Sequence, residues 1–444
     1  MADIGSKWEG NLSRINGKEF SDKDDIFSLF PTDQDKEELS QLIKPWLSAI
    51  FQSEHLSLLL GSGFTTAVAT QAGVKAAGMQ PSYDGFPTAK LLEEKVKESA
   101  TKAKRSVPNV EDQIRVANNL LEGMKILNHE CANVLDGAIK NLLTRFLQSI
   151  SETERQLGAA ISVEEVKNEL SASDMLVSFL LSFANRTASR ERLNIFTTNY
   201  ERLVEVGADL AGLRVVDRFV GCLEPVFRSS RVNVDMHYNP PGIRGEPRYL
   251  EGVVRLTKLH GSLDWKYKNG FVRKVGLPFG ASVDHPEFNT DVSGSVMIYP
   301  NSAKDRETSE YPYVELFRDY AATVCQPNSA LVTFGYGFGD EHINRVIEDM
   351  LSIPSTHLVI ISYDNAGGRI ESFCQKVGRK EQVTLLIGNH FGQMSELVEN
   401  YLPQPAVDLL KLRQAELARR MFVPEPQAKD EKKNIDVADE DVKF

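Results

Sequence analysis

The sequence of 444 residues has only four cysteines, Cys131, Cys222, Cys325 and Cys374, spaced about 50 or more residues apart. No two of them form a CxxC pair, so the pattern indicates neither a zinc ribbon nor a disulfide scaffold. The sequence also lacks an apolar run approaching the ~18–20 residues that span a bilayer. Its first residues have neither the basic start nor the apolar stretch of a signal peptide. We therefore expect a reduced, cytoplasmic protein.

Positive charge is in the minority, with 51 Lys and Arg against 62 Asp and Glu, a net charge of −11 and a pI near 5.4. Nucleic acids and anionic membranes are bound by clustered positive charge, so the balance argues against either as the main partner. The apolar fraction of 41% is ordinary for a soluble globular protein. The length leaves room for two or three structural units.

Short apolar runs dominate the body of the chain, at residues 56–60, 193–197, 253–259, 330–334, 358–363 and 383–387. Most are continuously apolar instead of alternating, which is typical of strands buried on both faces of a parallel sheet. Amphipathic helical patterns follow several of them, most clearly after Asp340. This alternation predicts an α/β fold, a Rossmann-like doubly wound parallel sheet.

The remaining segments predict additions to that sheet. Residues 1–54 are expected to form an N-terminal helical arm. Its amphipathic stretch spans residues 39–51, and Pro45 either kinks this helix or divides it in two. Its apolar face either packs on another subunit or covers the chain's own core. Residues 88–190 show almost no strand pattern and predict a large helical insertion between 55–87 and 191–400, which form the catalytic unit. Residues 401–444 predict a helix and a flexible charged tail, and Asn269-Gly270 predicts a hairpin.

The first strand ends in Gly61-Ser62-Gly63-Phe64-Thr65 and a helix follows. Glycines at such a turn allow the backbone to approach a pyrophosphate, whose charge the amides at a helix start favour. A Gly-x-Gly turn also occurs simply to pack a helix closely against a sheet, and this reading stays open.

The second and third strands end in polar residues. Thr198 and Asn199 follow the second strand, where Asn199 would hydrogen-bond a sugar, a carboxamide or water, or else one of the two caps the next helix. His260, followed by Gly261, ends the third strand, where an imidazole can act as a base near neutral pH. A hydrogen-bonded structural histidine is the alternative.

Two later strands also end in candidate ligand residues. A loop with Gly335 and Gly337 leads into Asp340, and Asp364 follows the next strand. Alternating glycines invite close approach of a ligand to the backbone, and acids at strand ends often bind ribose hydroxyls. Helix capping by Asp340 and a turn role for Asp364 explain the same residues.

In this order the motifs resemble the sirtuin family, over roughly residues 55–85 and 190–390. The resemblance implies that the first loop holds the pyrophosphate of NAD, that Asn199 contacts the nicotinamide ribose and that His260 supplies the base. The forms Thr-Thr-Asn-Tyr, Lys-Leu-His-Gly-Ser and Gly-Tyr-x-Phe-Gly-Asp are similar to those of prokaryotic sirtuin-like proteins of antiphage defence, which are typically NAD hydrolases. The size and N-terminal arm are similar to the form that assembles with a HerA-type hexameric ATPase.

Protein-deacylating sirtuins carry a four-cysteine zinc module after the His-Gly motif, whereas residues 265–312 contain no cysteine. The comparison therefore implies no zinc module and no metal ligands, and it disfavours deacylation because the acyl-lysine cleft lies beside that module. Glu201 stands where the family often has Asp, which puts its contact with ribose or nicotinamide in doubt.

The resemblance thus implies an NAD glycohydrolase with Asn199 and His260 as catalytic residues, NAD as substrate and no zinc. The residues implied to bind NAD, with Phe64 roofing the nicotinamide side, are Gly61, Ser62, Gly63, Phe64, Thr65, Thr198, Glu201, Gly335, Gly337, Asp340 and Asp364. We expect a homo-oligomer acting in abortive infection with a HerA-type ATPase, without membrane or sequence-specific nucleic-acid binding. The alternatives are an NAD-dependent protein deacylase and a non-catalytic regulatory module that binds NAD or ADP-ribose.

Overall fold

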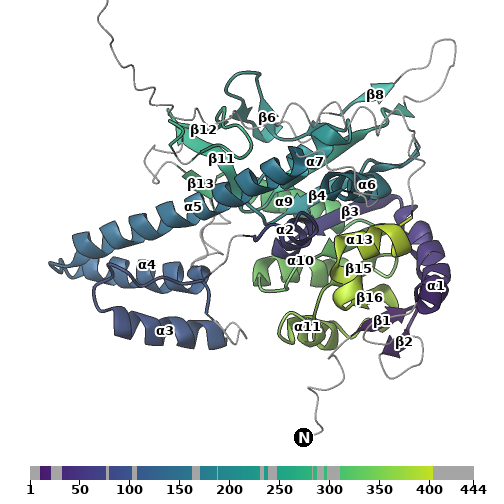
Figure 1. Cartoon of the computed structure of the whole chain (residues 1–444), viewed down its shortest axis with the longest axis horizontal. Coiled ribbons are helices and arrows are strands. Elements are labelled where there is room, and N and C mark those ends of the chain that lie inside the picture. The colour runs from purple at the N-terminus through teal and green to yellow at the C-terminus, as the bar shows by residue number, and fades with distance from the viewer. Residues whose placement is uncertain are drawn as a thin grey trace, which may run out of the picture.

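The computed structural model describes residues 11–21, 33–76, 80–102, 108–162, 171–187, 189–230, 235–238, 248–282, 284–287, 295–297 and 311–403. A nine-stranded sheet lies at its centre, in the order β2-β1-β16-β15-β14-β3-β4-β10-β5 (Figure 1). Its strands are β1 (Leu12–Ile15), β2 (Lys18–Ser21), β3 (His55–Leu60), β4 (Asn194–Thr197), β5 (Arg214–Val216), β10 (Val253–Lys258), β14 (Ser329–Phe334), β15 (His357–Ser362) and β16 (Val383–Ile387). From β16 to β5 all neighbours pair in parallel, which confirms the predicted doubly wound fold.

Helices cover both faces of this sheet. They are α1 (Asp33–Phe51), α2 (Ser62–Gln71), α3 (Ala89–Lys102), α4 (Val110–Ile126), α5 (Ala132–Ser162), α6 (Ala172–Ala184), α7 (Leu203–Leu210), α9 (Tyr313–Val324), α10 (Glu341–Leu351), α11 (Arg369–Val377), α12 (Asn389–Gly392) and α13 (Met394–Glu396). A 3-10 turn, η3 (Lys380–Gln382), precedes β16, and a π-helical turn, η4 (Leu397–Tyr401), follows α13.

Alternate residues of each central strand enter opposite cores, which explains why the apolar runs are continuous. In β3, Leu58 and Leu60 pack in one cluster with α1, α2, α6 and α7. Leu59 between them packs in a second cluster with α9, α10 and α11. All three side chains are fully buried. The chain runs outward from β3 to β4 and β10 and returns to β14, so the strand order reverses between β3 and β14. Open α/β sheets bind ligands outside the carboxyl ends of strands at such a reversal.

The N-terminal segment differs from the helical arm that its sequence predicts. Its β1 and β2 form a hairpin, and β1 pairs antiparallel with β16, extending the sheet at that edge (Figure 1). Helix α1 runs through Pro45 as one element. Its apolar face, including Ile43 and Leu47, is buried in the main core, and Trp46 Nε1 donates to Thr384 Oγ1 at 2.9 Å. The face therefore covers the chain's own core, the second of the two expected readings.

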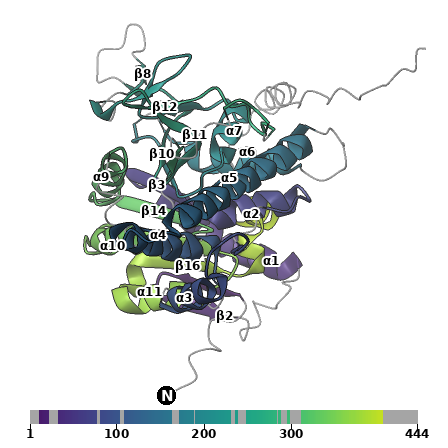
Figure 2. The same ribbon diagram turned by 90° about the vertical axis from the view of Figure 1, so that its left-hand side faces the viewer.

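The helices between β3 and β4 divide into two groups. Helices α3 and α4 and the start of α5 project from the sheet domain in Figure 1, and they face the viewer in Figure 2. They bury a separate apolar cluster that includes Ile114 and Leu135. The end of α5 and all of α6 pack in the main core, through residues such as Leu157 and Phe179. The predicted insertion is therefore helical, but its last part belongs to the layer that covers the sheet.

A second sheet combines two strands that precede the His-Gly motif with three that follow it. Its order is β13-β11-β12-β7-β6, built from β6 (Phe219–Val220), β7 (Val226–Phe227), β11 (Gly261–Lys268), β12 (Phe271–Lys274) and β13 (Ser295–Met297). Strands β8 (His237–Tyr238) and β9 (Arg248–Tyr249) pair separately. The turn between β11 and β12 has positive φ at Asn269 and Gly270, 55° and 80°, which confirms the predicted hairpin.

Two further expectations concern the ends of the chain and membranes. The C-terminal helix and charged tail predicted over 401–444 lie, apart from residues 401–403, outside the described residues. Among the described helices, none combines the length and the apolar character that a membrane crossing requires.

Candidate functional site

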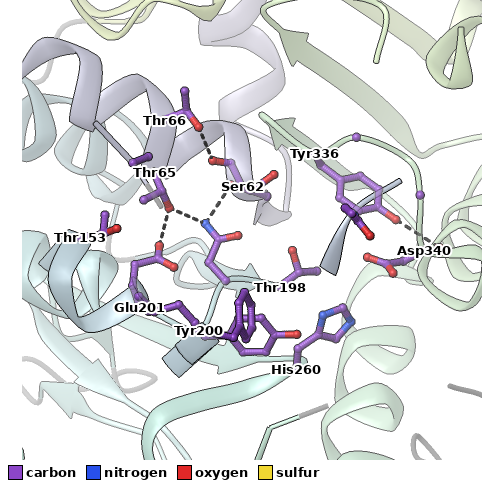
Figure 3. Close-up of a pocket in the computed structure, with 18 of the residues that line it drawn as sticks. Ser62, Thr65, Thr66, Thr153, Thr198, Tyr200, Glu201, His260, Tyr336 and Asp340 are labelled. Atoms are coloured by element: carbon purple, nitrogen blue, oxygen red, sulfur yellow. Dashed lines mark hydrogen bonds between the residues drawn. The ribbon is translucent and has the colours of Figure 1, made fainter. Parts of the chain in front are cut away.

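The carboxyl ends of four neighbouring strands surround one cavity of about 340 Å³. Parallel pairing sets Thr197 of β4 beside Leu60 of β3 and Lys258 of β10, while Phe334 of β14 lies on the other side of Leu60. The motif that follows each of these strands therefore lies at the same carboxyl edge of the sheet. The predicted residues that line this cavity are Gly61, Ser62, Thr65, Thr198, Asn199, Glu201, His260, Gly337 and Asp340 (Figure 3).

The two glycine loops pack directly against each other. The N–H groups of Gly61 and Gly63 donate to the carbonyl oxygens of Phe334 and Gly335, at 3.1 and 3.0 Å. A Cβ on Gly61 would lie 2.5 Å from Gly335 O, and Gly335 itself has a φ of 62°. Any side chain at these positions would force the loops apart. The glycines thus serve the close packing that was the alternative reading, and these two amides are already engaged by protein carbonyls.

Asn199 is fixed by hydrogen bonds from its amide nitrogen. Its Nδ2 donates to Gly61 O at 2.9 Å and to Thr65 Oγ1 at 3.0 Å, and the side chain is 7% exposed. Thr65 Oγ1 in turn donates to Glu201 Oε1 at 2.6 Å (Figure 3). Helix α7 begins after Arg202, so neither Thr198 nor Asn199 caps it. With Nδ2 engaged, the side-chain oxygen of Asn199 is the group left to address a ligand.

Glu201 lies behind Thr65 in this network. Burial raises the pKa of its carboxyl, although the Lys258 ammonium and the Thr65 hydrogen bond act in the opposite direction. Lys258 Nζ donates to the backbone oxygen of Glu201 at 2.5 Å and lies 3.3 Å from Glu205. Glu201 therefore anchors Thr65, and through it Asn199, in addition to lining the cavity.

His260 lies on the opposite side of the cavity from Ser62, next to Tyr200 (Figure 3). Its ring is 4% exposed, and the His260 and Tyr200 ring centroids are 6.4 Å apart. His260 Nε2 is 3.5 Å from Nε2 of His342, which follows Asp340 at the start of α10. Asp340 occupies the N-cap position of α10, but its side chain makes no capping hydrogen bond, so capping does not explain this acid.

A second cavity of about 1090 Å³ adjoins the first. It receives Gly63, Gly335 and Asp364 and shares Ser62, Thr66, Tyr336, Gly337 and Arg369 with the first cavity. Asp364 also makes a turn, because its Oδ1 accepts from Ala366 N at 2.7 Å. Arg369 Nε donates to Gly337 O at 2.6 Å, which sets a guanidinium where the two cavities meet.

One implied binding residue lies away from both cavities. The Phe64 side chain is fully buried and packs on Phe179 and Phe334, with ring centroids 5.6 and 6.3 Å away. The expected roofing role for this ring is therefore wrong. The cause is helical geometry: Phe64 lies on the face of α2 that covers the sheet, while Thr65 and Thr66 lie toward the cavity.

Several residues of this site have no signal in the sequence. Helix α5 contributes Phe146, Ile150 and Thr153 to the cavity wall, and Asn109 caps α4 at its rim. Arg369 comes from the start of α11. These residues belong to ordinary amphipathic or loop segments and reach the cavity only through long-range packing, whereas the predicted residues all follow strands directly.

Comparison with known families agrees with this architecture. Residues 193–382 match the sequence model of the SIR2-like domain, a span that runs from β4 to η3 and includes Asn199, His260 and Asp340. This part of the chain is thus similar to SIR2-like domains, which use NAD as a substrate. Among curated proteins, none matches the chain. The site is consistent with an NAD-dependent enzyme.

Proposed function

We propose that this protein hydrolyses NAD to nicotinamide and ADP-ribose. The observation that carries the proposal is the convergence of Asn199, held through its amide nitrogen, and His260 in one cavity at the carboxyl edge of the sheet. Arg369, between the two cavities, provides a positive charge for the pyrophosphate that joins the halves of NAD. The nicotinamide half would occupy the smaller cavity, and the adenosine half the larger one with Asp364.

The chemistry requires positioning more than acid catalysis. Cleavage of the N-glycosidic bond develops an oxocarbenium-like ribose, and nicotinamide leaves as a neutral molecule, so no general acid is needed. The Asn199 oxygen would orient the attacking water or a ribose hydroxyl. His260 would accept the proton that this water or hydroxyl releases. The Ser62 hydroxyl would contact phosphate or ribose, since the amides of the two glycines are engaged and the hydroxyls of Thr65 and Thr66 already donate within the protein.

We further propose that NAD depletion serves antiphage defence and that a HerA-type ATPase assembles with the chain. The defence role rests on the likeness of the three motif forms to defence proteins, and the ATPase partnership rests on the size of the chain and its N-terminal segment. The alternative of protein deacylation is disfavoured because residues 265–312 contain no cysteine for the zinc module of deacylating sirtuins. A purely regulatory NAD-binding module is disfavoured by the joint presence of Asn199 and His260 in the cavity.

The test measures NAD loss and products with the purified full chain, alone and with the ATPase. We expect free ADP-ribose and nicotinamide without any acyl-lysine peptide. Asn199→Ala and His260→Ala should each lower turnover at least ~10²-fold, whereas His237→Ala, at an exposed histidine, should not.

Near-normal turnover by a folded Asn199→Ala or His260→Ala variant would refute the assigned roles. Cleavage that depends on an acyl-lysine peptide and yields O-acyl-ADP-ribose would identify the deacylase instead. Absence of NAD cleavage both with and without the ATPase would overturn the hydrolase.

A further inference from the structure

Three metal-ligand side chains meet at the His260 end of the cavity. His260 follows β10, whereas Asp340 and His342 lie at the start of α10. Their ligand atoms, two imidazole nitrogens and a carboxylate oxygen, all lie within 4.8 Å of one another. His260 and Asp340 also line the cavity, so the cluster borders open space (Figure 3).

The distance between the two imidazoles fits metal ligation better than a hydrogen bond. The Nε2 atoms of His260 and His342 are 3.5 Å apart. Hydrogen bonds from an N–H usually span about 2.7–3.2 Å between heavy atoms. Two nitrogens at about 2.0–2.1 Å from one tetrahedral zinc are separated by about 3.3–3.4 Å. The rings thus already stand close to the separation that a shared metal requires.

We propose that His260, His342 and Asp340 form a binding site for a divalent transition metal of the zinc class. Two imidazoles and one carboxylate make up a three-ligand set that leaves a fourth position open, and two of the three ligands, His260 and Asp340, line the cavity. The carboxylate needs to move by at most about 1.4 Å to reach the ~3.4 Å donor spacing.

The surroundings support this arrangement. The ring of His342 packs edge-on against Phe317, with centroids 4.7 Å apart, and His260 is flanked by Tyr200. These contacts limit rotation of both imidazoles. The start of α10 carries the positive end of its helix dipole, which disfavours a cation, and the Asp340 carboxylate offsets it.

The site also has a consequence for catalysis, and this part rests on the proposed NAD hydrolysis. A metal bound to Nε2 of His260 takes the lone pair that would accept the proton. Metal binding and proton acceptance by His260 therefore exclude each other, so a zinc-class ion should suppress NAD cleavage reversibly. Metal binding to His260 would then explain how NAD cleavage, which depletes the cell of NAD, is inhibited until it is needed.

The binding test uses the full chain, freed of metal by a chelator and kept reduced. Zinc is titrated against a chromophoric competitor, and Co²⁺ is followed by its visible absorption. We expect one zinc per chain, with affinity lowered at least ~10²-fold by His342→Ala and by the isosteric Asp340→Asn. His237→Ala, at an exposed histidine outside the cluster, is the matched control and should bind as the unaltered chain does.

Circular dichroism and thermal melting establish that each variant is folded, and Asp340→Asn keeps the test decisive if His342→Ala does not fold. Equal zinc affinity in folded Asp340→Asn and the unaltered chain would overturn the site, as would Co²⁺ spectra showing thiolate ligation. The titration contains no NAD, so it decides the metal site even if NAD cleavage is absent. Loss of NAD cleavage on adding zinc, restored by chelator, would establish the exclusion; unchanged cleavage at saturating zinc would refute it.

Discussion

A buried ion pair ties the helical insertion to the loop that carries Asn199. Arg202, three residues after Asn199, donates through Nε and Nη2 to Glu154 of α5, at 3.1 and 2.5 Å. The side chains of Arg202 and Glu154 are 9% and 0% exposed. Burial acts to lower the pKa of the Arg202 guanidinium, but the Glu154 carboxylate outweighs it and the net shift is upward. The remaining donors of Arg202 reach the carbonyls of Leu277 and Pro278.

Replacing Glu154 with Gln should therefore be costly. The neutral amide leaves the guanidinium buried with only carbonyl partners, and removing one member of a buried pair typically costs about 3–5 kcal/mol. The matched control lies on the same helix: Glu152 pairs with Arg155, and both side chains are more than 40% exposed. An exposed pair contributes about 0–1 kcal/mol. Urea unfolding of both variants gives the two free energies directly.

The comparison also tests whether α5 positions the loop that carries Asn199. The Arg202 N–H donates to Glu154 Oε1 at 2.8 Å, so Glu154→Gln should disturb the start of α7 and reduce NAD turnover, while Glu152→Gln should leave it unchanged. Equal stability losses for the two variants, or a cost below about 1 kcal/mol for Glu154→Gln, would refute the reasoning. The pair would then contribute no more than a surface contact.

Two other predictions address the core and pH. Ile43→Ala in α1 should lower the free energy of unfolding by about 2–5 kcal/mol because Ile43 is fully buried. Leu42 is 42% exposed, so Leu42→Ala should change this free energy by less than about 0.5 kcal/mol. Similar losses for the two variants in urea unfolding would contradict the assigned buried face of α1. Burial lowers the pKa of His357 and His390 to about 4, from 6.5. The unfolded chain therefore takes up protons first as pH falls below 6.5, and stability should drop by up to about 1.4 kcal/mol per pH unit for each histidine until about pH 4. Urea titrations at pH 7, 6 and 5 check this drop, His390→Phe should reduce it, and an unchanged slope in that variant would argue against the assignment.

The sequence was sufficient for the central sheet and for most of the site. Continuously apolar runs such as 56–60 and 330–334 indicate strands buried on both faces, as in a covered parallel sheet. Residues that follow such strands, among them Asn199 and His260, necessarily gather at one edge. Local physics thus places them together without knowledge of any distant contact.

The failures share a physical cause. Phe64 and Thr65 are adjacent in the sequence, and only the seating of α2 on the sheet decides that Phe64 enters the core and Thr65 the cavity. The β1–β2 hairpin joins β16 from more than 350 residues away, a pairing that no local pattern encodes. Arg369 and the residues of α5 that line the cavity likewise reach it only through packing between segments that are distant in the sequence.

The sequence by itself determined the α/β class, the order of the motifs and the chemistry available at the strand ends, because these follow from local hydrophobicity and residue type. Only the tertiary structure decided that the amides of Gly61 and Gly63 bond to the neighbouring loop, that Glu154 holds Arg202, and that His342 approaches His260. Each of these depends on how separate segments pack, and packing is fixed by contacts between residues far apart in the chain.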